Sequence, residues 1–189
     1  MSIKSQDVIY RRHAIKTMKS GNGWQALARR GKVAIGEVVT APTQESVIVM
    51  VKRQLDEAAA TLQLLRGSDG FPTVDEIRAA LPYVKFNKAQ DAMLAAHLNA
   101  PDHILTATQL AQAAGYDDYA IANAQYGLLG RALAEELDWE PQKRKDGNPI
   151  WTITLATDAD GEAREGGKEI AGHWRWRLRP EIIAALSNG

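Results

Sequence analysis

The sequence predicts an α+β fold in two units: an N-terminal three-stranded antiparallel sheet with one helix, then a helical domain closed by a two-stranded hairpin. Three observations lead to this prediction. Residues 10–40 are rich in strand-forming side chains and are divided by glycine-containing turns. Residues 73–109 contain three helix-capping patterns in succession. Residues 149–179 contain two segments in which apolar and polar side chains alternate.

The composition is typical of a globular protein, with 189 residues of which 45% are hydrophobic and 24% are charged. The absence of cysteine excludes disulfides, thiolate metal sites and a cysteine nucleophile. With only four histidines, we expect no metal site and no cofactor. No apolar run reaches the roughly 20 residues that span a bilayer, and the N-terminus lacks a secretory pattern. We therefore expect a cytoplasmic protein that does not contact the membrane.

The charge is balanced overall but is uneven along the chain. Residues 1–68 hold 11 basic and 5 acidic side chains, a net charge of +6, and residues 69–189 hold 12 and 18, a net charge of −6. Such a division indicates two units with different partners or two units that attract each other. The alternative is that the uneven distribution of surface charge arose by chance. A neutral total argues against strong unspecific binding to nucleic acid, but a local basic surface remains compatible with it.

The first unit, residues 1–68, is expected to contain three strands and one helix. The strands are expected at Tyr10–Met18, Trp24–Arg30 and Val33–Thr40. Thr43 can cap the helix that follows. The apolar positions of that helix form one stripe that would pack on the sheet, namely Val47, Val51, Leu55, Ala58, Leu62 and Leu65.

Cations on the strands and turns of this unit form a second candidate face for DNA. Its residues are Arg11, Arg12, Lys16, Arg29, Arg30 and Lys32. The alternative is that these charges only keep exposed sheet edges from pairing with other chains.

The second unit, residues 71–189, is expected to begin with capped helices. Thr73 with Glu76, Asn87 with Gln90 and Thr106 with Gln109 each have the spacing of a capping box. The segment of about 106–138 then has the spacing of a helix-turn-helix. Ala111 is small where the helices approach, Gly115 suits a left-handed turn, and Ile121 and Ala124 are expected to pack on the first helix. The second helix is expected to run from the N-cap Asp118 to about Leu137.

In this register, four residues of the second helix point away from the core, namely Tyr119, Ala122, Asn123 and Tyr126, with Gln125 beside them. Amide side chains can bond adenine edges, and tyrosine can bond phosphate or stack, so Tyr119, Asn123, Gln125 and Tyr126 are candidate DNA-binding residues. The alternative is a plain helical hairpin whose polar face is only hydrated.

A hairpin of about residues 149–179 is expected to form a basic wing. Its strands are Ile150–Ala156 and His173–Arg179, joined by an acidic, glycine-rich loop over Thr157–Gly172. Trp174, Trp176 and Leu178 would share one face of the second strand. Six cations are candidate phosphate contacts, namely Lys143, Arg144, Lys145, Arg175, Arg177 and Arg179. The alternative is that the arginines pair with the acidic loop.

Helix, helix, turn, helix and hairpin is the order of a winged helix-turn-helix domain. The segments ANAQYG, GNPIWTITLAT and HWRWRLRPE also resemble non-catalytic winged-helix segments that precede HNH nuclease domains in bacterial restriction-like proteins. The resemblance covers about residues 74–189 and implies reading of DNA, including modified or foreign DNA. This chain departs from that family because no His-Asn-His cluster is present, so only the DNA-reading role is carried over.

No enzyme is expected. The sequence has no P-loop, no dinucleotide-binding glycine motif, no nucleophile elbow and no zinc-protease motif. His97 and His103 flank a helix end and are expected to face solvent rather than to share a metal with Asp102.

The sequence therefore predicts a non-catalytic protein, related to phage or restriction systems, that binds double-stranded DNA. A homodimer is a further candidate state, since palindromic sites are read by two copies. The alternative function is a protein-interaction adaptor, a phage or host-interference factor, because the second unit is net acidic.

Overall fold

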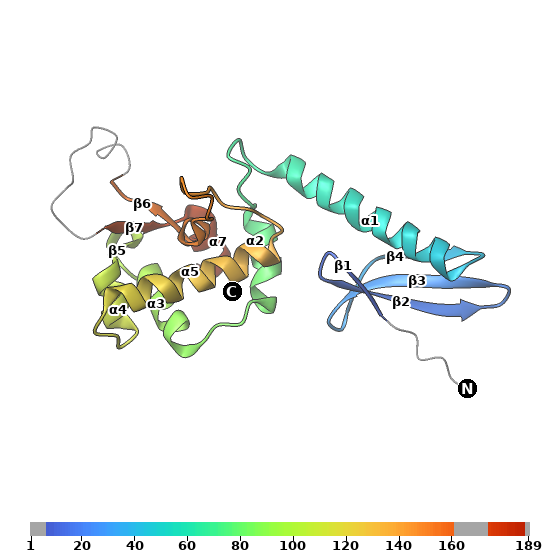
Figure 1. Ribbon diagram of the computed structural model, residues 1–189, viewed down its shortest axis with the longest axis horizontal. Helices are drawn as coiled ribbons and strands as arrows, with labels where there is room; N and C mark the ends of the chain where they lie inside the picture. The colour runs from blue at the N-terminus through green and yellow to red at the C-terminus, as the bar shows by residue number, and fades with distance from the viewer. Residues whose placement is uncertain (1–6, 161–173, 188–189) are drawn as a thin grey trace. The chain divides into compact units, whose positions relative to one another are not determined.

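The structure is a computed structural model that describes residues 7–160 and 174–187. The chain divides into two compact units, residues 1–66 and 67–189, each of which has its own hydrophobic core (Figure 1). The fold is α+β, as predicted.

The N-terminal sheet has four strands, so the prediction of three was wrong. The strands are β1 (Val8–Tyr10), β2 (His13–Ser20), β3 (Gly23–Arg30) and β4 (Val33–Ala41), in the order β1-β2-β3-β4 and all antiparallel. The predicted first strand is broken at Arg11 and Arg12, which form a two-residue turn with φ of 42° and 60°. Such turns favour Gly or Asn, so two arginines give no turn signal in the sequence.

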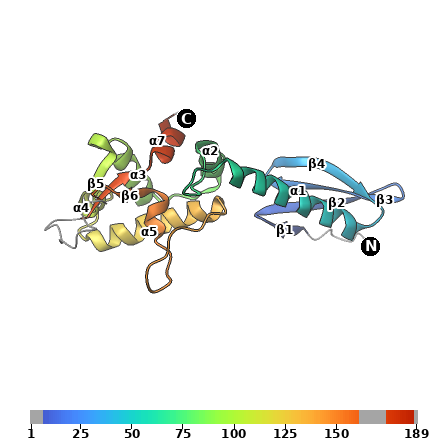
Figure 2. The ribbon, with the colours of Figure 1, turned by 90° about the horizontal axis from the view of Figure 1, so that it is seen from above.

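Helix α1 (Gln44–Leu65) packs on one face of this sheet (Figure 2). Thr43 caps the helix, as predicted, by accepting the Ser46 N–H at 3.1 Å. Only Val47, Val51 and Leu55 of the predicted stripe are buried. Ala58, Leu62 and Leu65 are exposed because the helix continues beyond the strands, so the stripe was predicted too long.

The second unit contains the four helices that the capping residues predicted and a further helix that begins at Pro180. The helices are α2 (Val74–Ala80), α3 (Lys88–Leu98), α4 (Ala107–Ala113), α5 (Tyr119–Glu136) and α7 (Pro180–Ser187), with 3₁₀ turns η1 (Leu81–Tyr83) and η2 (Pro101–His103). All three capping boxes form with both hydrogen bonds. Gly115 takes a φ of +73° between α4 and α5, a conformation that glycine adopts at little cost. Asp118 caps α5 by accepting the Ala120 N–H at 2.8 Å.

A three-stranded sheet lies beside these helices. Its strands are β5 (Ile104–Thr106), β6 (Ala156–Asp158) and β7 (Arg175–Leu178), in the order β5-β7-β6 with both pairings antiparallel. The strand predicted at His173–Arg179 is confirmed as β7, whereas β5 was not predicted. Most of the expected loop, from residue 161 on, and His173 lie outside the described residues.

The strand predicted at Ile150–Ala156 was wrong, because Trp151–Thr154 forms the 3₁₀ helix η3 and only Ala156 enters β6. The alternation of apolar and polar side chains in this segment does not distinguish a strand from a 3₁₀ turn that packs on a helix. Here η3 packs on α5 at Gly130, where the backbone carbonyl of Trp151 approaches so closely that a Cβ would lie 2.1 Å from it.

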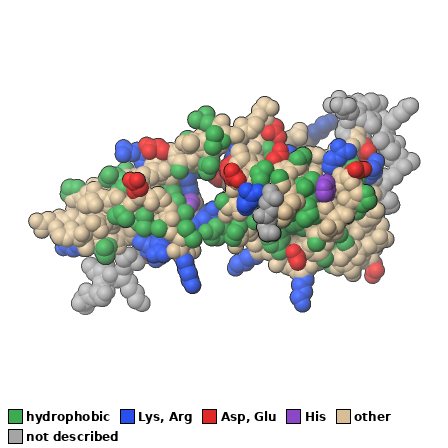
Figure 3. Space-filling model, turned by 180° about the vertical axis from the view of Figure 1, so that it is seen from behind, with side chains coloured by type: hydrophobic (Ala, Val, Ile, Leu, Met, Phe, Trp, Pro, Cys, Tyr) green, Lys and Arg blue, Asp and Glu red, His purple; other side chains and the backbone are tan. Residues whose placement is uncertain are grey.

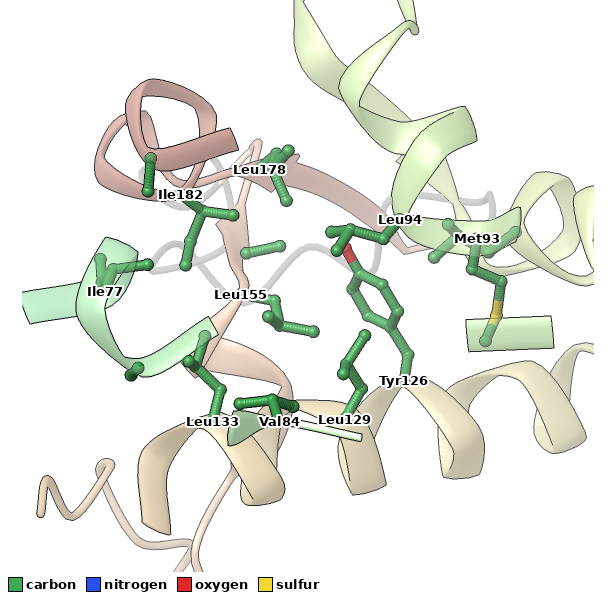
Figure 4. Close-up of a cluster of buried hydrophobic side chains, with 14 of the residues drawn as sticks. Ile77, Val84, Met93, Leu94, Tyr126, Leu129, Leu133, Leu155, Leu178 and Ile182 are labelled. Atoms are coloured by element: carbon green, nitrogen blue, oxygen red, sulfur yellow. The ribbon is translucent and has the colours of Figure 1, made fainter. Parts of the chain in front are cut away.

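The core of this unit is built from α2, α3, α4, α5, α7 and the sheet. Figure 4 shows side chains from α2, α3, α5, β7 and α7 that meet around Leu155. Tyr126 is the largest of the fully buried side chains.

Gly130→Ala is expected to destabilise the protein by about 2 kcal/mol or more, since η3 must shift to admit a methyl group. Gly127→Ala is the matched control. Its Cβ would lie 3.8 Å from the Thr152 hydroxyl, and replacing a helical glycine by alanine should stabilise α5 by up to about 1 kcal/mol. Urea unfolding measures both variants, and equal effects would contradict the close approach.

Candidate nucleic-acid interface

The rotation of α5 about its axis decides which side chains can meet a ligand. Ala122, Tyr126, Leu129 and Leu133 are buried and face the core. Tyr126, at 1% exposure, and Ala122 were predicted to point outward, and this prediction was wrong. Ile121 and Ala124 were predicted to pack on α4 and are exposed instead. Tyr126 is therefore not available to contact DNA.

A buried chain of hydrogen bonds explains this rotation. The Tyr126 hydroxyl lies 2.7 Å from His97 Nδ1, and His97 Nε2 lies 2.9 Å from the backbone carbonyl oxygen of Trp176. A carbonyl oxygen only accepts, so Nε2 carries the proton and donates, and Nδ1 accepts from Tyr126. The chain joins α5, α3 and β7. Rotation of α5 would leave buried polar groups without partners, which is costly.

His97 is fully buried, so the expectation that it faces solvent was wrong. It lies on the face of α3 that also buries Met93 and Leu94. A helical spacing of four from Met93 was the sequence signal that could have placed it inside. Burial lowers the pKa of His97, and this effect exceeds that of the hydrogen bonds to the backbone of Trp176 and His103, which raise it. Burial also raises the pKa of the Tyr126 phenol.

Gln125 is engaged by the start of α3. Its side-chain oxygen accepts from Asn87 Nδ2 at 3.1 Å, and its backbone oxygen accepts from Gln90 Nε2 at 3.2 Å. Asn87 and Gln90 form the capping box of α3. The half-buried Gln125 thus links α5 to α3. Because its side-chain oxygen already accepts a hydrogen bond, Gln125 has less hydrogen-bonding capacity for a DNA base than the sequence suggested.

Tyr119 and Asn123 are exposed at the N-terminal end of α5, as predicted. Tyr119 is 53% exposed. Of the four polar side chains predicted to read DNA, these two have the required accessibility.

Arg175 and Arg177 are exposed side chains on β7, in agreement with the predicted basic strand. Trp176 between them faces the core and Leu178 is fully buried. Arg175 Nη1 donates to Asp160 Oδ1 at 3.1 Å. A surface ion pair of this kind contributes little free energy, so another anion can replace Asp160 on Arg175. Arg177 makes no ion pair with any described residue.

Arg179 does not share the exposed face of Arg175 and Arg177, so its predicted place was wrong. Its guanidinium lies 3.8 Å from the centre of the Phe71 ring and its Nε donates to the Ile153 carbonyl at 2.7 Å. An ion pair with Asp69 at 3.7 Å completes its contacts. Burial lowers the pKa of this guanidinium. Arg179 holds the segment before α7 rather than a phosphate.

Lys143, Arg144 and Lys145 are exposed in a narrow loop after the C-terminal end of α5 (Figure 2). The loop is closed by the bridge between Lys143 and Pro149, and Lys143 pairs with Glu140 at 2.7 Å. The 18 residues of α5 span about 27 Å, so these cations follow the opposite end of α5 from Tyr119. The structure therefore does not gather all the predicted cations around the start of that helix.

The six cations of the N-terminal unit do not share one face. The sheet register places Lys16 and Arg29 on the face away from α1, whereas Arg30 lies on the other face. Arg11, Arg12 and Lys32 lie in the β1–β2 and β3–β4 turns, which meet at one end of the sheet. The cations thus form a basic end rather than the basic face that the sequence suggested.

Several of these cations already have partners. Arg11 Nε donates to Asp56 at 2.6 Å, and this bond and one from Tyr10 lower the pKa of the Asp56 carboxyl. Lys16 pairs with Asp7, and an Nη atom of Arg29 donates to the Lys32 carbonyl at 2.5 Å. The two ion pairs, of Arg11 with Asp56 and of Lys16 with Asp7, reduce the charge that the N-terminal unit offers to an anion.

Among residues 7–160 and 174–187, no cluster of acidic or histidine side chains could hold a metal ion. No helix in the described part of the chain is long and apolar enough to cross a bilayer.

No family model, no curated protein and no solved structure matches this chain. The resemblance to winged-helix segments therefore stays a prediction from the residues.

Tyr126→Phe is expected to lower the free energy of unfolding by about 1–3 kcal/mol, because His97 Nδ1 then lacks its buried donor. Tyr119→Phe on the same helix is the control. Its side chain is half exposed, so water can replace the bonds of the lost hydroxyl, and we expect a change below about 0.5 kcal/mol. Chemical unfolding compares the two, and a tolerated Tyr126→Phe would contradict the bond.

Stability is expected to fall as the pH drops below about 6.5, the ordinary pKa of histidine. The folded-state pKa of His97 is lowered, so the unfolded chain binds the proton first and unfolding becomes easier until the folded-state pKa is reached. Thermal unfolding from pH 7.5 to 5 measures this. In His97→Gln the pH dependence should be flatter, and an unchanged profile would assign it to other groups.

Proposed function

We propose that residues 67–189 form a winged-helix domain that binds double-stranded DNA. The observation that carries the proposal is the order α3, β5, α4, α5, β6, β7 combined with the pairing β5-β7-β6. In this arrangement β7 lies between β5 and β6 in one sheet. The sheet lies beside α4 and α5, which are joined by the turn at Gly115. In such domains the second of these helices enters the major groove and the strands touch the backbone.

Different residues are proposed for base and phosphate contacts. Tyr119 and Asn123, exposed at the start of α5, are the base-reading candidates. Arg175 and Arg177 on β7 are the phosphate contacts, since both are exposed and flank a core-facing Trp176 that fixes their direction. Arg144 and Lys145 are exposed cations beyond the other end of α5.

Electrostatics sets limits on this interface. Residues 69–189 carry a net charge of −6, and Asp117 and Asp118 precede α5. The N-terminal N–H groups of α5 partly compensate Asp118, which caps that helix. We therefore propose an interface with few phosphate contacts, whose affinity is moderate and falls as salt increases.

A protein-interaction adaptor is the second candidate, and the N-terminal sheet favours it. Helix α1 covers one face of that sheet, and the other face exposes Ile9, Met18 and Val38. Figure 3 shows that apolar side chains stay at the surface of both units among Lys and Arg. Exposed apolar side chains at neighbouring positions are typical of contact with another protein.

Binding to a fluorescent 20-base-pair duplex over a salt series tests the first candidate. Arg175→Ala with Arg177→Ala is expected to weaken binding for all sequences and to reduce the slope of log K against log salt by about 2, one unit for each phosphate contact. Asn123→Ala should instead change the order of preference among duplexes.

The matched control is Arg78→Ala with Lys85→Ala, which removes two exposed charges from α2 and the segment before α3. It should leave the salt slope unchanged. Loss of affinity in this control equal to that in the β7 variant would show that net charge rather than the β7 strand determines binding. Retention of a host protein with no affinity for any duplex would favour the adaptor.

A further inference from the structure

His97 is a fully buried titratable side chain whose two ring nitrogens face different elements. Nε2 donates to the backbone carbonyl of Trp176 on β7, and Nδ1 accepts from the Tyr126 hydroxyl on α5. These two roles hold only for the neutral ring, because a protonated imidazole has a donor at each nitrogen and no acceptor. Protonation would therefore keep the bond to β7 but would place two donors, Nδ1–H and the Tyr126 hydroxyl, against each other.

No described group offers the Tyr126 hydroxyl a second bond that would relieve this conflict. Among residues 7–160 and 174–187, His97 is the hydrogen-bond partner of that hydroxyl, and the tyrosine is only 1% exposed. A hydroxyl that turned to accept from Nδ1–H would bury its own proton without an acceptor, which is costly. Burial also raises the pKa of the phenol, so Tyr126 keeps that proton.

The elements packed around His97 bring no charge that would balance a protonated ring. On α5, residues 119–130 contain no charged side chain, and α4 and β5 contain none. The η2 turn contributes the exposed Asp102 and the half-buried His103, and a positive charge on His103 would repel that of His97. Within the described part of the chain, no carboxylate contributes to the pKa of His97.

The charged side chains of α3, β6 and β7 also lie elsewhere. Lys88 and Asp91 are exposed in the first turn of α3. Arg175 and Arg177 are exposed on β7, on the side away from the core-facing tryptophan between them. Asp158 of β6 uses Oδ1 to accept a backbone N–H. A protonated His97 is therefore stabilised only when water reaches its ring.

The N-terminal half of α5 is held to the core by few side chains. Of residues 119–126, only Ala122 and Tyr126 are buried, and Tyr126 is by far the larger. Figure 4 shows the Tyr126 side chain reaching from α5 toward Leu94 of α3. The half-buried Gln125 adds hydrogen bonds to the start of α3. A segment with so few buried contacts can open while the rest of the unit stays folded.

The C-terminal half of α5 is anchored more extensively. Leu129 and Leu133 are buried in the core, and the backbone carbonyl of Trp151 packs closely against Gly130. Gly127 lies at the border of the two halves, and glycine weakens a helix interior by about 1 kcal/mol relative to alanine. This glycine is where α5 can bend or end when its first half leaves the core.

We propose that the contact of His97 with Tyr126 is an acid-sensitive latch: protonation of His97 releases residues 119–126 from α3, whereas the bond to Trp176 keeps β7 in place. Release brings water to Nδ1–H and to the Tyr126 hydroxyl, which gives both donors a partner. The released segment carries the side chains that the proposed function assigns to base contacts. The latch itself does not depend on DNA binding.

The direction of the effect follows from the pKa of His97. Burial lowers that pKa below the ordinary histidine value of about 6.5, and the ring regains the ordinary value once water reaches it. The released form then binds the proton more tightly than the closed form. Release is therefore favoured below about pH 6.5, by up to about tenfold per pH unit, until the pKa of the closed form is reached.

Hydrogen exchange of the full-length protein between pH 7.5 and 5.5, corrected for the intrinsic pH dependence of exchange, tests the latch without any ligand. We expect the amides of residues 119–126 to be less protected than those of 129–136 and 175–178 at every pH. Their protection should fall by up to about tenfold per pH unit below about pH 6.5.

His97→Gln is expected to remove this pH dependence from residues 119–126, because an amide side chain does not titrate in this range. His103→Gln is the matched control, since it removes the neighbouring titratable ring and should retain the dependence. The unchanged protein gives a second measurement that needs no variant. In its NMR spectra, the ring signals of His97 and the amide signals of 119–126 should titrate with one midpoint, while those of 175–178 stay unchanged.

Equal protection of the three segments at every pH would overturn the inference, because the whole unit would then open together. Protection of 119–126 that does not change with pH, or that changes equally in His97→Gln, would also overturn it. So would separate NMR midpoints for the His97 ring and these amides. None of these outcomes bears on the proposed function, which duplex binding at pH 7.5 tests with the latch closed.

Discussion

The rest of the C-terminal unit depends on the buried bonds from Tyr126 to His97 and from His97 to the carbonyl of Trp176. These bonds join α5, α3 and β7, which come from distant parts of the chain, at a place that excludes water. A buried polar group is tolerated only with its partners, so few rotations of α5 are compatible with the fold. Burial at this place lowers the pKa of His97, and the hydrogen bond to the backbone of Trp176 ties β7 to α3.

This constraint separates the two tasks that the proposed DNA-binding surface requires. Tyr119 and Asn123 at the start of α5 are the proposed base contacts, whereas Arg175 and Arg177 on β7 supply charge from an element that α3 orients. Division of base contact and phosphate contact between elements is common in DNA-binding domains. It also explains why a unit with a net charge of −6 remains a reasonable candidate for DNA binding: the few exposed cations need only be placed correctly.

The N-terminal unit illustrates the opposite situation, in which backbone geometry rather than a buried polar contact is decisive. Arg11 and Arg12 adopt positive φ in a two-residue turn, a conformation that the neighbouring strands impose. The same turn brings Arg11 to Asp56 of α1, so part of the charge that made this unit basic in the sequence is used inside the unit. The uncovered face of its sheet exposes both apolar and basic side chains.

Local signals in the sequence determined the helix boundaries, because caps and turns act over three or four residues. Thr73, Asn87, Thr106 and Asp118 each begin a helix where predicted. The sequence did not determine which side of α5 faces outward. Alanine and glycine occur all around that helix, so no single apolar stripe marks the inner side. Tertiary structure decided the rotation of α5. His97 Nδ1 on α3 accepts a hydrogen bond from the Tyr126 hydroxyl, and the close approach of η3 requires a glycine at position 130.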